Sequence, residues 1–174
     1  MLRLAHQIWK NHLKAGDVAV DATAGNGYDT LFLFEMEPSH LYVFDIQKKA
    51  IENTQIRVGM HKNISYHLGC HSTFPGVERP VNLIVYNLGY LPGGDKSLTT
   101  KGESTVKSLE TALYLLAPKG MISVMLYSGH LEGEREKETI LKWGSHLSSK
   151  KFYVSHHNPL NHFKAPSLLL IYKT

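Results

Sequence analysis

The stretch VAVDATAGNGYDT, residues 18–30, decides the fold. A short apolar run ends at an acid, Asp21, and two glycines, Gly25 and Gly27, follow with one residue between them. A glycine-rich turn between a first strand and a first helix is typical of nucleotide-binding α/β proteins, because glycine lets the backbone approach a ligand closely. The third glycine of the dinucleotide pattern G-x-G-x-x-G is missing, since that position holds Thr30. The turn therefore predicts a nucleotide-type cofactor and argues against a dinucleotide.

The acids around this turn narrow the choice of ligand. Asp21 and Asp29 place two carboxylates where a pyrophosphate would need positive potential. A cationic ligand is favoured instead, and S-adenosylmethionine carries a sulfonium and an ammonium beside a neutral ribose. Asp45 ends the next apolar segment, where a carboxylate can accept hydrogen bonds from both ribose hydroxyls. NAD uses the same contact, and Asp29 is also explained as a helix cap, so neither acid identifies the cofactor alone.

The rest of the chain alternates between strand-like and helix-like segments. Apolar or β-rich segments occupy residues 18–22, 41–45, 64–69, 81–87 and 121–127. Helical stretches separate them at residues 28–36, 47–60, 100–117 and 131–149, the last with a charged run at 132–138 that is expected to be a solvated face. The alternation predicts a parallel sheet with helices on both faces. Two final segments, 150–158 and 166–173, leave no room for a crossover helix and are predicted to be an antiparallel pair.

The whole chain, residues 1–174, is thus predicted to be one domain, with an amphipathic helix in residues 1–15 and a Rossmann-like core in 16–174. The α/β fold is expected to have a seven-stranded, mostly parallel sheet that ends in a C-terminal antiparallel hairpin. The length is sufficient to bury a core without metal or disulfide support. No two histidines sit on a predicted helix at HxxxH spacing, and no metal is expected.

The composition indicates which cellular compartment and which classes of binding partner to expect. The single cysteine, Cys70, excludes an internal disulfide and favours a reducing, cytoplasmic setting. No apolar run has the length of a membrane span, about 18 residues. The formal net charge of +4 allows an anionic partner such as RNA without requiring one.

Two further strand ends carry candidate site residues. GCHS, residues 69–72, follows the third strand and places Cys70 and His71 on the adenine side of the expected cleft, although Cys70 is also explained as a small buried apolar residue. NLGYLPGGDKS, residues 87–97, follows the fourth strand. There Asn87 can accept a hydrogen bond from an amine and Tyr90 can stack on a base, although a tight loop would also use these glycines and the proline.

The segments DATAGNGYDTLFL, NLGYLPGGDKS and GHLEGEREKE closely resemble the bacterial YtqB/MnmM family, once labelled rRNA methylase, over nearly the whole chain. Tyr28 departs from the His expected there in many relatives and is expected to begin the helix. The resemblance implies a class I methyltransferase that uses S-adenosylmethionine and releases S-adenosylhomocysteine. The implied substrate is the primary amine of 5-aminomethyl-2-thiouridine at the tRNA wobble position, and the product is 5-methylaminomethyl-2-thiouridine. The implied partner is the tRNA anticodon arm, with homodimer formation left open.

Carried onto this chain, the resemblance and the strand ends assign three sets of residues. The expected cofactor-binding residues are Asp21, Thr23, Gly25, Asn26, Gly27, Asp29, Thr30, Asp45, Ile46, Gln47, Cys70, His71, Asn87, Leu88 and Gly89. The expected catalytic residues are Asn87, Tyr90, Asp95 and His130, of which Asn87 would orient the amine while one of the other three takes its proton. The expected substrate-binding residues are Tyr90, Leu91, Pro92, Lys96, Lys101 and Lys164, and Glu134 is expected to border the same cleft.

Three other functions are compatible with parts of this pattern. A methyltransferase acting on rRNA or on a small-molecule amine would use the same cofactor turn. A nucleotide-binding dehydrogenase is disfavoured by the missing third glycine and the extra acids. A non-catalytic RNA-binding module is disfavoured by the complete set of cofactor-like residues.

Overall fold

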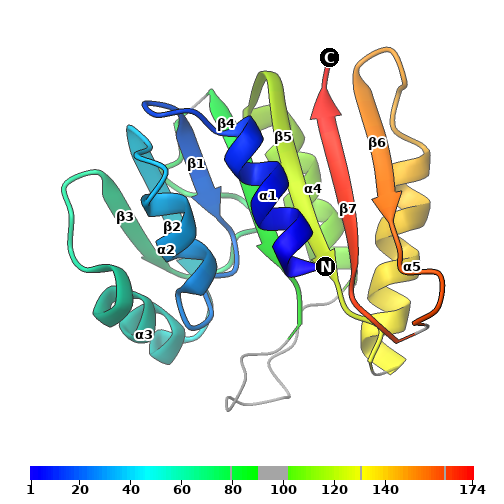
Figure 1. Cartoon of the computed structure of the whole chain (residues 1–174), viewed down its shortest axis with the longest axis horizontal. Helices are drawn as coiled ribbons and strands as arrows, with labels where there is room; N and C mark the ends of the chain where they lie inside the picture. The colour runs from blue at the N-terminus through cyan, green and yellow to red at the C-terminus, as the bar shows by residue number, and fades with distance from the viewer. Residues whose placement is uncertain (79, 90–101, 130, 163) are drawn as a thin grey trace.

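The computed structural model describes residues 1–78, 80–89, 102–129, 131–162 and 164–174 (Figure 1). Its strands are β1 Val18–Asp21, β2 His40–Asp45, β3 Ile64–Leu68, β4 Val81–Asn87, β5 Leu116–Leu126, β6 Phe152–His157 and β7 Ser167–Lys173. Its helices are α1 Leu2–His12, α2 Tyr28–Phe34, α3 Lys48–Val58, α4 Gly102–Leu115 and α5 Leu131–Ser145. In the part of the chain that is described, none of the helices is long and apolar enough to cross a membrane.

The strands form a single sheet in the order β3-β2-β1-β4-β5-β7-β6. Strands β1 to β5 pair in parallel, and β7 runs antiparallel to both β5 and β6. The predicted seven-stranded sheet with a C-terminal antiparallel hairpin is therefore confirmed. Because β1, β2 and β4 are parallel, their carboxyl ends meet at one edge of the sheet (Figure 1).

Side chains alternate between the two faces of the central strands and build two separate cores. Ala19 and Leu83 point to one face, where they pack with Trp9 of α1 and with residues of α2 and α3. Val20 and Ile84 point to the other face, where α4 and α5 cover them. Helices therefore lie on both faces, as the alternation of segments predicted.

Helix α4 and strand β5 follow each other directly, although the sequence predicted a helix over residues 100–117 and a strand over 121–127. The helix ends at Leu115, and the strand begins at Leu116 instead of residue 121. The pairing with β4 jumps from Val81↔Leu116 to Leu83↔Met121, so the extra residues bulge out of the ladder. Lys119 takes a left-handed φ of 62° in this bulge. The proline and glycine of this segment thus interrupt a strand as well as ending a helix.

The charged run at 132–138 is not wholly solvated, because Glu136 is buried. Gly133, Glu136, Ile140 and Gly144 form the buried stripe of α5 at helical spacing. Glu136 accepts a hydrogen bond of 2.8 Å from the Thr105 hydroxyl of α4. The prediction of a solvated face is wrong for this residue, since the position of Glu136 in the stripe turns it toward α4.

Candidate functional site

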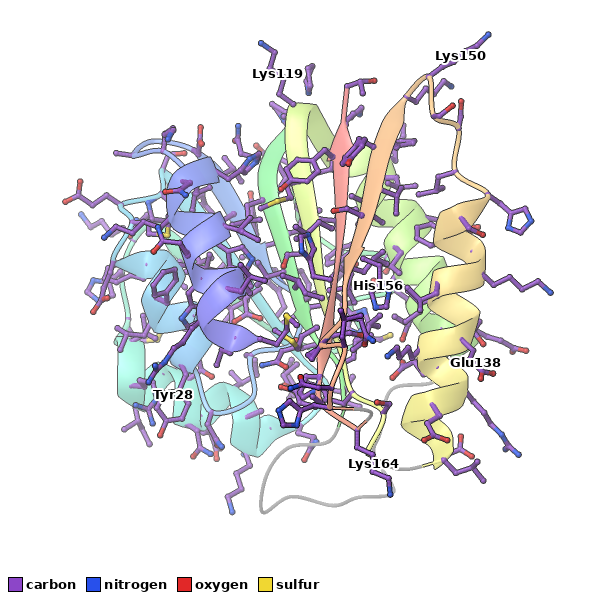
Figure 2. The ribbon with its side chains drawn as sticks, turned by 45° about the vertical axis from the view of Figure 1, so that its right-hand side comes forward. Tyr28, Lys119, Glu138, Lys150, His156 and Lys164 are labelled. Carbon is purple, nitrogen blue, oxygen red and sulfur yellow. The ribbon has the colours of Figure 1, made fainter. Side chains whose placement is uncertain are left out.

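The candidate site lies at the edge of the sheet where β1, β2 and β4 end. Asp21, Asp45 and Asn87 are the last residues of these three strands. Tyr28 and Lys164 lie toward the same end of the molecule, whereas Lys119 and Lys150 lie at the opposite end (Figure 2). This edge is the place where open parallel sheets bind their ligands.

The glycine turn after β1 has left-handed backbone and close neighbours. Gly25 and Gly27 have φ values of 55° and 79°, and Gly27 is the N-cap of α2. The Ala24 amide donates to the Phe44 carbonyl at 2.9 Å and ties the turn to β2. A Cβ on Gly27 would lie 2.8 Å from the Thr54 Cα of α3. Gly27 therefore serves the close packing of α3 against the turn as well as its conformation.

Replacing Gly27 with alanine should lower the free energy of unfolding by about 1–3 kcal/mol, because Thr54 backbone leaves no room for a Cβ. Gly16→Ala is the matched control, since Gly16 also has a left-handed φ, 87°, but no atom lies within 4 Å of the position that its Cβ would take. Urea unfolding of both variants separates backbone strain from the contact. An equal loss of stability in the two variants would contradict this role of Gly27.

Asp45 holds the turn from the end of β2. Its two carboxylate oxygens accept hydrogen bonds from the backbone amides of Gly25, at 3.0 Å, and Gln47, at 2.9 Å. Burial raises the pKa of Asp45, while the amides of Gln47, Gly25 and Ile46 counteract that rise. A carboxylate has about four acceptor positions, so this one retains capacity for a ribose hydroxyl. The residue fits the cofactor role predicted for it.

Asp21 is buried directly beneath the turn. It accepts hydrogen bonds from the Thr30 hydroxyl at 2.6 Å and from the Thr23 amide at 3.1 Å. Burial, and secondly the charge of Asp29, raise the pKa of Asp21 to about 7, and the charge of Asp45 adds to the effect. Near neutral pH Asp21 is therefore only partly ionised, and a ligand with a sulfonium and an ammonium, which favours the charged form of a nearby acid, fits this cluster better than a pyrophosphate.

Asp21→Asn should gain stability over the wild type as the pH rises from 4 to 8. The pKa of Asp21 is about 7 in the folded protein and 3.8 as the ordinary value. Its contribution to stability is fully present below pH 3.8 and is lost as the pH rises through 7. One pKa unit corresponds to about 1.4 kcal/mol, so the difference between the two proteins should change by a few kcal/mol, on the order of 2–4.

The measurement is urea unfolding of Asp21→Asn and wild type at each pH from 4 to 8. Taking the difference in unfolding free energy at each pH cancels the contribution of other titrating groups. One of these groups is His71, because burial lowers the pKa of His71 to about 4. A difference that stays constant across this range would refute the raised pKa of Asp21.

Asp29 joins the end of β4 to helix α1. One carboxylate oxygen, Oδ1, lies 2.7 Å from His6 Nε2, and the other, Oδ2, accepts a hydrogen bond of 3.0 Å from Asn87 Nδ2. The Tyr127 hydroxyl also makes a hydrogen bond with the Asn87 side chain. Gly27 is the N-cap of α2 and the described hydrogen bonds of the Asp29 side chain go to His6 and Asn87, so the interpretation of Asp29 as a helix cap is wrong.

His6 and Tyr127 are the two described residues of this network that the sequence did not point to. His6 belongs to the amphipathic helix α1 and Tyr127 follows β5 directly. His6 and Asp29 are 23 residues apart in the sequence, so a short sequence motif could not have predicted their contact. Helical periodicity identified only the apolar face of α1, which contains Ala5 and Trp9.

The two residues predicted after β3 have different surroundings. His71 is buried and its Nδ1 lies 2.7 Å from the Ser108 hydroxyl of α4. Burial lowers the pKa of His71 to about 4, so it is neutral at neutral pH. Cys70 is exposed, and its interpretation as a buried apolar residue is wrong because the chain has already left the sheet after Leu68.

The remaining predicted cofactor residues line the strand ends or brace them. The Thr23 hydroxyl accepts a hydrogen bond of 2.6 Å from the backbone amide of Asn87 and thereby joins β1 to β4. Asn26 faces α3, where its Oδ1 accepts from Asn53 at 3.0 Å. The residues that follow Asp45 and Asn87 are the half-exposed Ile46 and Gln47, the buried Leu88, and Gly89 with φ 134°.

Of the other assigned residues, the structure describes only Lys164 and Glu134, and Glu134 lies in α5. Lys164 and Glu134 are exposed. The residues Tyr90, Leu91, Pro92, Asp95, Lys96, Lys101 and His130 lie outside the described residues. Within the described ranges, no group of three or more His, Cys, Asp or Glu residues is arranged to hold a metal ion. Tyr28 begins α2 as predicted, and the Arg57 guanidinium lies 3.7 Å from the centre of its ring.

Comparison with known proteins agrees with this arrangement. A plant protein, the chloroplastic "tRNA (mnm(5)s(2)U34)-methyltransferase" of Arabidopsis thaliana, is 35% identical over 98% of this chain and 68% of its own length. A crystal structure described as a "putative rRNA-methylase" from Clostridium thermocellum is 35% identical, with a TM-score of 0.95 over 99% of this chain and 97% of that one.

A protein from Streptococcus mutans described as "a putative methyltransferase", solved in complex with SAH, is 32% identical, with a TM-score of 0.89 over 99% of this chain and 97% of that one. These similarities confirm the class I methyltransferase fold. The family model described as "Putative rRNA methylase" matches residues 41–173. The chain therefore belongs to the rRNA methylase family of class I methyltransferases.

Proposed function

We propose that this protein transfers a methyl group from S-adenosylmethionine to the primary amine of 5-aminomethyl-2-thiouridine at the wobble position of tRNA. The product is 5-methylaminomethyl-2-thiouridine. The observation that carries the choice of substrate is the 35% identity, over 98% of the chain, to the Arabidopsis enzyme described as acting on this nucleoside.

The cofactor part of the proposal rests on charge and on hydrogen-bonding capacity. When bound, S-adenosylmethionine supplies a methyl group attached to a positively charged sulfur. The cluster of Asp21, Asp29 and Asp45 suits a cationic ligand, whose charge favours the ionised form of Asp21, and Asp45 has acceptor capacity for its ribose. The SAH complex of the Streptococcus mutans relative supports the same cofactor.

The acceptor part rests on Asn87. Its Nδ2 donates to Asp29, so its Oδ1 is the end of the amide that can accept a hydrogen bond from an amine. A primary alkyl amine is mostly protonated near neutral pH and must lose a proton before its nitrogen can attack. Asn87 orients the amine, and we assign the proton transfer to Tyr90, Asp95 or His130, of which histidine has the most suitable ordinary pKa.

Mass spectrometry of tRNA nucleosides tests the substrate. A strain that lacks the gene should accumulate 5-aminomethyl-2-thiouridine and lose the methylated product. Expression of the wild type should restore the product, and expression of Asn87→Ala should not. An unchanged nucleoside profile in the deletion strain would contradict the proposed substrate.

Binding of tRNA should depend on salt through a few lysines, for which we propose Lys96 and Lys164. We expect a log–log slope of about −2 to −4, and the double variant Lys96→Ala, Lys164→Ala should flatten it by about one to two units. Lys119→Ala with Lys150→Ala is the matched control, because these lysines lie at the opposite end (Figure 2). Tyr90→Ala should weaken binding without changing the slope, since stacking is not screened by salt.

Filter binding or fluorescence anisotropy from low to high salt measures these slopes. If the Lys96→Ala, Lys164→Ala variant and the Lys119→Ala, Lys150→Ala variant have equal slopes, Lys96 and Lys164 do not contact the RNA. Binding that ignores salt altogether would favour a small-molecule amine as the substrate.

A further inference from the structure

Helix α1 contributes a polar side chain to the acceptor side of the site. His6 Nε2 lies 2.7 Å from Asp29 Oδ1, and because a carboxylate can only accept, the imidazole donates. The His6 ring stacks on Phe32 of α2, with ring centres 4.1 Å apart and planes 13° apart. Trp9 packs beside it with a centre distance of 5.0 Å. The imidazole is therefore held in one orientation by its aromatic neighbours.

Asp29, held by His6, in turn holds the side chain of Asn87. The same carboxylate accepts from Asn87 Nδ2 at 3.0 Å through its second oxygen. An asparagine amide has a donor end and an acceptor end of nearly equal shape, and an acceptor-only neighbour selects between them. Nδ2 donates to Asp29 and the Tyr127 hydroxyl also hydrogen-bonds this side chain, and the amide oxygen, which has two lone pairs, keeps acceptor capacity for an amine. Asp29 and His6 have side chains that are only 8% and 24% exposed, so solvent does not compete strongly for these bonds.

We propose that His6 is a positioning residue for methyl transfer: it holds the Asp29 carboxylate, which fixes the Asn87 amide with its oxygen toward the incoming amine. The inference rests on the proposed function for the identity of the amine. The relay itself is a property of the described side chains and can be tested without substrate.

Two substitutions at His6 separate hydrogen bonding from packing. His6→Phe keeps an aromatic ring against Phe32 and Trp9 but has no donor for Asp29. His6→Gln restores a side-chain N–H but removes the ring. His12→Phe is the matched control, because His12 lies on the same helix and its Nε2 contacts the Asn82 carbonyl oxygen at 3.1 Å, at the other end of β4.

The first readout is the side-chain amide resonance of Asn87 in ¹H–¹⁵N spectra of the protein with SAH, identified by its loss in Asn87→Ala. His6→Phe should shift this resonance and speed its exchange with water, while His6→Gln and His12→Phe should leave it close to the wild-type position. Calorimetry should give SAH affinities within about threefold of the wild type for all three variants, since the loss is confined to the acceptor side.

The second readout is steady-state kinetics on tRNA that carries the aminomethyl nucleoside. His6→Phe should lower kcat about tenfold with little change in KM, the effect of losing one positioned hydrogen bond. His6→Gln should recover kcat to within about threefold of the wild type. Circular dichroism and melting temperatures identify any variant whose helix α1 has come away from the sheet.

The outcomes distinguish this inference from the proposed function. An Asn87 resonance that is unchanged in folded His6→Phe would overturn the relay. A wild-type kcat in His6→Phe together with a lowered kcat in His6→Gln would also overturn it. If the resonance responds as expected but even the wild type fails to methylate the tRNA, the relay stands and the proposed substrate falls.

Discussion

Asn87→Ala is expected to lower turnover about a hundredfold while the affinity for S-adenosylmethionine stays within a few-fold of the wild type. Loss of one polar group that positions a reacting atom typically has an effect of this size on kcat. The backbone amide of Asn87, which donates to Thr23 Oγ1 at 2.6 Å, is retained in the variant, so the link between β1 and β4 persists. What is lost is the side-chain bond to Asp29 and the amide oxygen offered to the amine.

The matched control is Asn82→Ala in the same strand. Asn82 Oδ1 accepts a hydrogen bond of 3.0 Å from the Val18 amide at the amino end of β4, away from the site. It should reduce stability without reducing kcat. Single-turnover methylation and calorimetry with SAH on both variants give the comparison. Loss of cofactor binding together with turnover in Asn87→Ala would place the residue in the cofactor site or in the fold.

The sheet was predictable because its signals are local and repeat along the chain. Most of the strands are short apolar runs, and helices α2, α3 and α4 connect β1 to β2, β2 to β3 and β4 to β5, so the order of segments nearly determines the topology. Asp21, Asp45 and Asn87 could be placed together because each ends such a run, and the carboxyl ends of parallel strands share an edge.

The contacts that cross between elements were not predictable from local signals. His6 is an ordinary polar position of an amphipathic helix until α1 docks and brings it to Asp29. Glu136 is the same residue type as the exposed Glu132, Glu134 and Glu138, and only the packing of α5 on α4 buries it against Thr105. The exposure of Cys70 depends on the chain leaving the sheet at Leu68, a boundary that composition does not specify.

Asp45→Ala is expected to weaken S-adenosylmethionine binding by about tenfold to a hundredfold, since hydrogen bonds to a charged group contribute about 1.5–3 kcal/mol each. The variant loses the proposed ribose contact and also releases the amides of Gly25 and Gln47, which loosens the turn itself. Asp45→Asn should lose less, because its amide oxygen can still accept from one of these groups.

Asp17→Ala is the matched acid control for that experiment, because Asp17 precedes β1 at its amino end and its carboxylate accepts only from the Lys14 amide, at 2.8 Å, among the described hydrogen bonds. It should leave the affinity unchanged. Calorimetry with S-adenosylmethionine on the three variants, after circular dichroism has established that each is folded, gives the order expected: Asp17→Ala equal to the wild type, Asp45→Asn intermediate and Asp45→Ala weakest. A folded Asp45→Ala with wild-type affinity would mean that the ribose is held elsewhere, and the acid at the end of β2 would then serve only to close the glycine turn.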